Sequence, residues 1–142
     1  DDIQSLQASL FRQLNMGMTD DAEKSMKALI ADVPYSNKKL ASMDMEERYR
    51  LIISTILNAV GIRVEVERML AGGRIDIVAW TSHYIYVMEL KLSNNGGVLA
   101  AEKQIKDCGY MEPFKAYKRD VVALAVELDA QGKGLVGWKR VE

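Results

Sequence analysis

The chain has 142 residues, of which 49% are hydrophobic and 27% charged, a composition typical of one soluble globular domain with a sizeable core. Its 19 basic and 20 acidic side chains nearly cancel, which excludes a strongly basic nucleic-acid-binding chain and leaves only local clusters of charge for that purpose. A single cysteine excludes an internal disulfide and predicts a cytoplasmic protein. Because the chain has only one cysteine and one histidine, a zinc site is not expected. The longest apolar stretch, residues 51–62, is too short and too polar to span a membrane.

Residues 1–32 are predicted to form two helices, because hydrophobic side chains recur at helical spacing on both sides of Gly17. Pro34 ends the second helix, and the polar residues that follow are typical of a linker. We interpret residues 1–40 as a helical lead-in from an upstream domain and residues 41–142 as the main domain. The chain begins with Asp1 rather than methionine, which favours its being part of a longer protein.

The main domain alternates helix and strand patterns. A helix is predicted over residues 44–59, ended by Gly61, and an alternating strand over 62–69. Strands at 74–80 and 84–92 are joined by a short hairpin, and a helix follows at 98–110. The very apolar segment 120–128 is predicted to be a central strand, and 135–141 a final one. This order predicts an α/β fold, in which helices flank a mixed sheet and an N-terminal helical extension precedes it.

Three charged residues interrupt the apolar strands: Asp76, Glu89 and Lys91. A charge inside an apolar strand is costly unless it is paired or binds a metal. A two-residue hairpin turn at Ser82-His83 would place Asp76 opposite Glu89, whereas a turn at Thr81-Ser82 would place it diagonally. Both registers put Asp76 on the face of Glu89 and Lys91, but a one-residue bulge would reverse it.

Two carboxylates about 5–7 Å apart on one sheet face repel each other unless a cation lies between them. We therefore predict a Mg²⁺ or Mn²⁺ site formed by Asp76 and Glu89, to which Leu90 could add its backbone carbonyl. The metal would polarise a scissile phosphate, and Lys91 would orient or help to deprotonate the attacking water. The alternative is a solvated sheet face on which the three charges form cross-strand ion pairs.

The spacing Asp76…Glu89-Leu90-Lys91 resembles the active-site signature of the PD-(D/E)XK nuclease superfamily. More narrowly, three segments resemble a nuclease-like module found C-terminal to an AAA-ATPase-like domain in many uncharacterised prokaryotic proteins. These segments are Gly73-Arg74-Ile75-Asp76, Glu89-Leu90-Lys91-Leu92 and Gln104-Ile105-Lys106-x-x-Gly109-Tyr110. The resemblance covers roughly residues 33–138. Arg50 departs from it, because a histidine is expected at that position.

The resemblance implies a restriction-endonuclease-like core with the order αβββαβ. It implies that Asp76 and Glu89 bind the metal, that Lys91 is catalytic, and that Glu47 supports the metal from the preceding helix. Gln104, on the helix after Lys91, matches a polar residue that lies near the site in several branches of the superfamily.

Further expectations concern function. The first hypothesis is a Mg²⁺-dependent nuclease that cuts nucleic acid, DNA more than RNA, as the C-terminal module of an ATPase-like protein. Such an enzyme could act as a homodimer, with no membrane partner. The second hypothesis is a nuclease-derived binding or assembly domain without catalysis.

Arg74 is expected either to bind phosphate or to pair with Glu65 or Glu67. The remaining basic side chains form either a rim for the phosphate backbone or an ordinary solvated surface: Lys103, Lys106, Lys115, Lys118 and Arg119.

Overall fold

A computed structural model describes residues 1–34 and 41–142 of the chain. The five strands form one sheet in the order β1 to β5, which is also their order in the sequence. β3 and β4 are parallel and the other neighbours are antiparallel, so the sheet is mixed as expected. Their bounds are Arg63–Leu70 (β1), Gly73–Trp80 (β2), Tyr84–Leu92 (β3), Asp120–Leu128 (β4) and Leu135–Val141 (β5).

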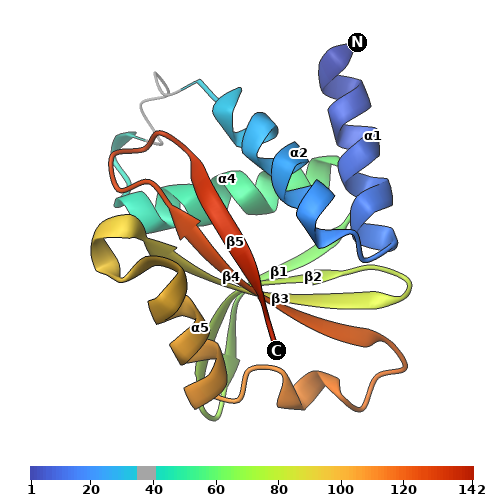
Figure 1. Cartoon of the computed structure of the whole chain (residues 1–142), viewed down its shortest axis with the longest axis vertical. Coiled ribbons are helices and arrows are strands. Elements are labelled where there is room, and N and C mark those ends of the chain that lie inside the picture. Colours follow the sequence, from blue (N-terminus) through green and yellow to red (C-terminus); the bar gives the residue numbers. More distant parts are fainter. Residues whose placement is uncertain (35–40) are drawn as a thin grey trace.

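Helices cover both faces of the sheet, which confirms the predicted α/β architecture with a restriction-endonuclease-like core (Figure 1). The helices α1 (Asp2–Asn15), α2 (Thr19–Ala31) and α4 (Met45–Ala59) lie on one face. The helix α5 (Gly97–Asp107) and the short turn η2 (Glu112–Phe114) lie on the other face. A further short turn, η1 (Ser93–Asn95), connects β3 to α5.

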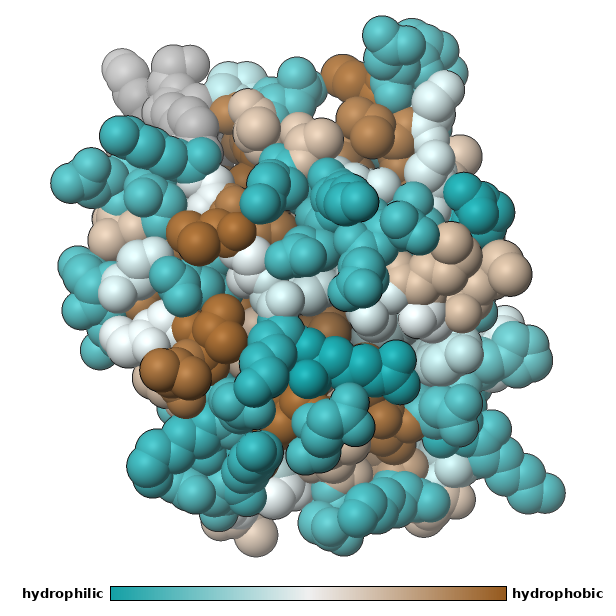
Figure 2. All heavy atoms as spheres, viewed as in Figure 1, coloured by the Kyte–Doolittle hydropathy of each residue, from teal (hydrophilic) through white to brown (hydrophobic). Residues whose placement is uncertain are grey.

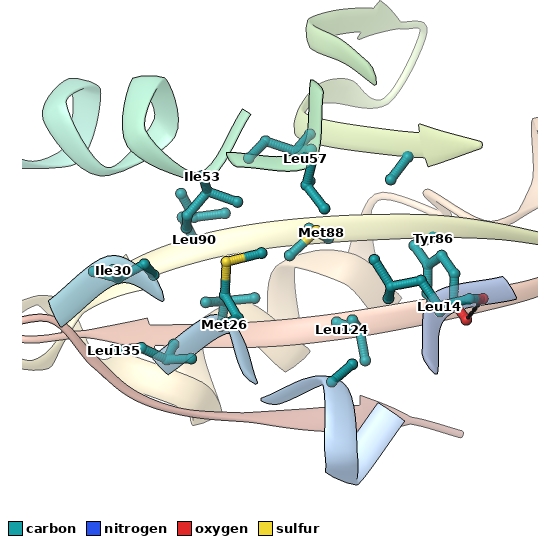
Figure 3. Close-up of a cluster of buried hydrophobic side chains, with 14 of the residues drawn as sticks. Leu14, Met26, Ile30, Ile53, Leu57, Tyr86, Met88, Leu90, Leu124 and Leu135 are labelled. Atoms are coloured by element: carbon teal, nitrogen blue, oxygen red, sulfur yellow. Dashed lines mark hydrogen bonds between the residues drawn. The ribbon is translucent and has the colours of Figure 1, made fainter. Parts of the chain in front are cut away.

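The N-terminal helices share the core of the main domain. Figure 3 shows Leu14 of α1 beside Tyr86 of β3, whose hydroxyl donates a hydrogen bond to the Leu14 carbonyl. α2 is tied to β5, because the Trp138 backbone N–H donates to Glu23 Oε2 at 2.6 Å. A domain boundary near residue 40 stays a prediction, since residues 35–40 lie outside the described part of the chain.

The hairpin between β2 and β3 has the first of the two expected turns, the one at Ser82-His83. The Thr81 N–H donates to the Tyr84 carbonyl at 2.9 Å, so Ser82 and His83 form the turn. The ladder runs from the pair Trp80–Ile85 to the pair Ile77–Met88, which makes Asp76 and Glu89 the next opposed positions. The register that places Asp76 opposite Glu89 is therefore the one found.

The apolar side chains of β3 anchor this arrangement. Figure 3 shows Leu90 of β3 next to Ile53 of α4, and both are fully buried. Because side chains alternate along a strand, burial of Leu90 against α4 turns Glu89 and Lys91 towards the α5 side. On the face seen in Figure 2, hydrophilic side chains cover most of the surface and hydrophobic ones form separate patches. None of the described helices is long and apolar enough to cross a membrane.

Candidate active site

Asp76 lies where the regular pairing of β2 is interrupted on both sides. The pairing between β1 and β2 omits the Glu67–Asp76 position, and Glu67 has a left-handed backbone with φ of 52°. On the other side the ladder with β3 ends before Asp76. The freed Leu90 N–H donates to Asp76 Oδ2 at 2.8 Å, and Asp76 is only 3% exposed. The carboxylate thus occupies the split between β2 and β3.

Glu89 is buried next to Asp76, and one of its oxygens lacks a partner in the described part of the chain. It is 2% exposed, and its Oε1 atom accepts no hydrogen bond from residues 1–34 or 41–142. Burial, and then the charge of Asp76 and a hydrogen bond with its side chain, raises the pKa of Glu89 to about 9. A carboxyl group in such surroundings holds a proton at neutral pH unless a cation replaces it.

Lys91 lies next to Glu89, between the two buried carboxyl groups and solvent. Its Nζ atom is 3.9 Å from Glu89 Oε2, and its side chain is 19% exposed. A cleft of about 360 Å³ opens beside it against α5, lined also by Asn95, Lys103 and Gln104. The ammonium group therefore faces both the buried carboxyl and open space.

Gln104 is connected to the start of β2 by hydrogen bonds through Tyr110. Its Nε2 atom donates to the Tyr110 hydroxyl at 3.1 Å, and that hydroxyl donates to the Arg74 carbonyl at 2.8 Å. The turn before β2 packs equally closely, because a Cβ atom on Gly72 would meet the Cys108 carbonyl oxygen at 2.6 Å. These contacts hold the end of α5 against the strand that carries Asp76.

The neighbouring glutamates at the start of α4 differ in burial, and Glu46 is the half-buried one. Glu47 is exposed, and its backbone N–H donates to the N-cap Asp44 at 3.1 Å. Burial, followed by the charge of Asp76, raises the pKa of Glu46, while Lys91 lowers it. Glu46 lies three residues before the buried Tyr49, on the helix stripe that packs on the sheet. That spacing is the sequence signal that distinguishes the two glutamates.

Arg50 is a second residue that the sequence did not assign to the site. Its Nη1 atom lies 3.5 Å from Asp76 Oδ1, and its Nη2 atom lies 2.7 Å from Glu67 Oε1. Arg74 reaches the other oxygen of Glu67 at 3.3 Å, which is the ion pair expected for it, and its phosphate-binding role stays a prediction. The acid of β2 is thereby linked to the edge of the sheet through alternating charges.

The donor set fits a hard divalent cation. Glu89 offers an unpartnered, desolvated oxygen next to a second carboxylate, and oxygen ligands of this kind suit Mg²⁺ or Mn²⁺. Among the described residues, no three His, Cys, Asp or Glu side chains are grouped closely enough to hold a metal. Asp76 and Glu89 would therefore hold the ion with backbone oxygen, from Leu90, and water as the remaining ligands.

The fold and this split-strand acidic site define a nuclease-like α/β protein. Residues 44–138 match the family model described as PD-(D/E)XK nuclease superfamily, and the chain belongs to that superfamily. Members of the superfamily generally use divalent metal ions.

Among curated proteins, the chain is similar to an "Uncharacterized protein in vnfD 5'region" of Azotobacter chroococcum mcd 1. The two are 27% identical over 114 residues, which are 78% of this chain and 22% of that protein. The chain thus spans about a fifth of its relative's length. No solved structure gives a significant match.

Proposed function

We propose that the chain is a metal-dependent nuclease that hydrolyses phosphodiester bonds. The observation that carries the proposal is the buried, unpartnered Glu89 oxygen beside Asp76, with Lys91 at the open side. A pair of acids arranged only as ion pairs would satisfy both carboxylates from within the protein. Here one acceptor is left for a ligand that the described residues do not supply.

Each residue has a distinct role in this proposal. Asp76, oriented by the Leu90 N–H, and Glu89 would hold Mg²⁺ or Mn²⁺, with the Leu90 carbonyl as a third oxygen donor. A bound divalent ion supplies charge that polarises the phosphate and makes a water more acidic. Lys91 places a positive charge where negative charge develops on the phosphate, and it orients the attacking water. Gln104 positions β2 through Tyr110, and an acid from α4 supports the metal pair, for which Glu46 is better placed than Glu47.

The wider setting is part of the same proposal. DNA is the proposed substrate, and the chain is the C-terminal module of a larger, cytoplasmic ATPase-like protein that acts with nucleic acid. Residues 1–40 would connect the two parts, and two copies would pair where both strands of a duplex are cut. The 22% coverage of the relative from Azotobacter is consistent with a module in a longer chain.

Two measurements test the proposal. Calorimetric titration of Mn²⁺ should show binding to the wild type and none to Asp76→Ala. Incubation with single-stranded and duplex DNA and with RNA should give Mg²⁺-dependent cleavage that Lys91→Ala reduces at least about a hundredfold, while metal binding persists, because the lysine acts mainly in the transition state. Lys27→Ala, which removes an exposed positive charge from α2, is the matched control and should cleave as the wild type does.

Metal binding that is equal in the wild type and Asp76→Ala would overturn the metal site. Metal binding without cleavage of any of these substrates would instead support a nuclease-derived binding domain.

A further inference from the structure

A second pocket lies at the opposite end of the β2–β3 hairpin from Asp76. It has a volume of about 320 Å³ and is bordered by the end of α1, the start of β1 and the hairpin turn. Its polar lining includes Arg63, Arg119, Thr81 and Ser82, with Trp80 as its largest aromatic side chain. This size is at the lower end of the range for small-ligand sites, about 300–1,000 Å³.

Two arginines line this pocket, one at the start of β1 and one just before β4. The guanidinium carbon of Arg63, at the start of β1, lies 5.0 Å from the centre of the Trp80 ring. The guanidinium carbon of Arg119, just before β4, lies 5.4 Å from the same ring. An indole ring offers a cation favourable electrostatic contact but no hydrogen-bond acceptor for its N–H groups.

The charges of the two arginines are not neutralised within the described part of the chain. No carboxylate there lies within 4.0 Å of either guanidinium. Glu65 lies on the same strand face as Arg63, and its carboxylate accepts from Trp80 Nε1 at 2.6 Å and from Arg68 at 3.1 Å rather than pairing with Arg63. Two guanidinium groups that line one pocket, neither of them paired with a carboxylate, favour the binding of an anion there.

We propose that this pocket binds a phosphate group of the nucleic-acid backbone, held by Arg63 and Arg119 with the Ser82 turn beside them. Guanidinium groups match phosphate in charge and geometry, and the Trp80 ring keeps both groups oriented before the ligand arrives. The inference rests on the proposed nuclease function and extends it by naming a second contact to the substrate.

The edge strand β1 connects this pocket with the metal-binding acids. Arg63 is paired with Trp80 at one end of the ladder, and Glu67 lies opposite Asp76 four residues further along β1. Four residues of strand span about 13 Å, and successive base pairs of a duplex are about 3.4 Å apart along its axis. In a duplex whose axis runs along β1, a phosphate in the pocket would therefore lie about four nucleotides from the one being cut.

The test measures binding without divalent metal, so that it does not depend on cleavage. Fluorescence anisotropy in EDTA, with a labelled 12-nucleotide DNA single strand and its duplex, gives the dissociation constant between 50 and 200 mM salt. The double variant Arg63→Ala/Arg119→Ala should bind at least about tenfold more weakly, and the slope of log K against log salt should fall by about one, because one phosphate contact is lost. The control Lys24→Ala/Lys27→Ala removes two exposed positive charges from α2 and should match the wild type.

A second variant guards against unfolding of the arginine variant, whose thermal midpoint is measured alongside. Ser82→Asp adds a negative charge at an exposed turn residue and should weaken binding to a similar extent. In Trp138→Phe, where Trp80 is the remaining tryptophan, inorganic phosphate should change the fluorescence, and Arg63→Ala/Arg119→Ala should abolish that change.

Equal affinity and salt slope in the arginine variant and the lysine control would overturn the proposal. A fluorescence response to inorganic phosphate without oligonucleotide binding would also overturn it, because the site would then serve free phosphate. Loss of DNA binding in the arginine variant, with no cleavage by the wild type, would support this pocket while the proposed catalytic function fails.

Discussion

The guanidinium group of Arg50 lies 3.5 Å from Asp76 Oδ1, so the acid of the β2–β3 split already has a cation beside it. Their side chains are 11% and 5% exposed, which leaves little water to screen the pair. The same arginine is held at 2.7 Å by Glu67. A divalent ion placed between Asp76 and Glu89 would be repelled by Arg50. The arginine should therefore stabilise the metal-free protein while it weakens metal binding.

Arg50→Ala should lower the metal-free stability by about 1–3 kcal/mol, because a buried carboxylate loses its charged partner. The same change should tighten Mn²⁺ binding by a factor of about three, since a competing positive charge is removed. Thermal unfolding with and without Mn²⁺, together with calorimetry, measures both effects. Arg68→Ala serves as the control, because Arg68 pairs with Glu65 and not with Asp76 or Glu89. An Arg50→Ala variant with unchanged stability and weaker metal binding would show that the arginine supports the ion.

Glu46 and Glu47 form a matched pair for testing which acid of α4 serves the site. Glu46→Gln should weaken Mn²⁺ binding about tenfold, as expected for a residue that supports metal ligands from outside. Glu47→Gln removes the same charge from the next residue, which is exposed. This variant should leave the Mn²⁺ affinity unchanged. Calorimetry on the two variants decides between them, and the opposite pattern would return the supporting role to Glu47.

The metal-free protein should lose stability as the pH rises. The pKa of Glu89 is raised from an ordinary 4.5 to about 9, chiefly by burial. The native state therefore keeps a proton between these values that the unfolded state releases, so this contribution is complete below about pH 4.5 and is lost as the pH rises through about 9. Glu89→Gln, which stays neutral, should have a flatter profile and a higher thermal midpoint at pH 9 in EDTA.

Mn²⁺ should restore the stability of the wild type at high pH and have no such effect on Glu89→Gln, because metal binding requires the ionised carboxyl. Thermal unfolding from pH 5 to 9 provides the measurement. A wild-type profile in EDTA that runs parallel to that of Glu89→Gln would contradict the buried, protonated state of Glu89.

Tyr49 provides a stability test that does not involve the acids. Its hydroxyl donates to the Asp129 carbonyl at 2.7 Å and accepts from the Gly134 N–H at 3.1 Å, joining α4 to the β4–β5 turn. Tyr49→Phe leaves these two backbone groups without that partner and should cost about 1–3 kcal/mol of unfolding free energy. Urea denaturation measures the loss, and Mn²⁺ affinity should not change. A loss below about 0.5 kcal/mol would mean that water replaces the hydroxyl.

Much of the fold could be predicted because its elements carry strong local signals. The alternation in β1, the continuous apolar run of β4 and the helical stripes of α1, α2 and α4 each identify one element type. The hairpin register was limited to two options by strand periodicity, and the hydrogen bond between Thr81 and Tyr84 selects one. The packing of α1 and α2 into the main core depends on contacts between distant segments, which periodicity does not specify.

The candidate site was predictable to the extent that it follows strand parity. Asp76, Glu89 and Lys91 stand out because charges are rare in apolar strands, whereas Glu46 and Arg50 are ordinary residues for the first turns of a helix. Their importance arises from the angle at which α4 crosses the sheet. The interruption at Glu67 also has no sequence signal, because glycine or asparagine is the usual residue in a left-handed conformation.

Two opposing requirements act at position 67, where the glutamate has a left-handed backbone. A non-glycine residue at φ of 52° costs about 1 kcal/mol, so glycine at position 67 would relax the backbone. The same replacement would release Arg50 and Arg74, both of which the Glu67 carboxylate holds. Selection for an ordered active site should therefore keep glutamate at position 67, in spite of the backbone strain that glycine would relieve.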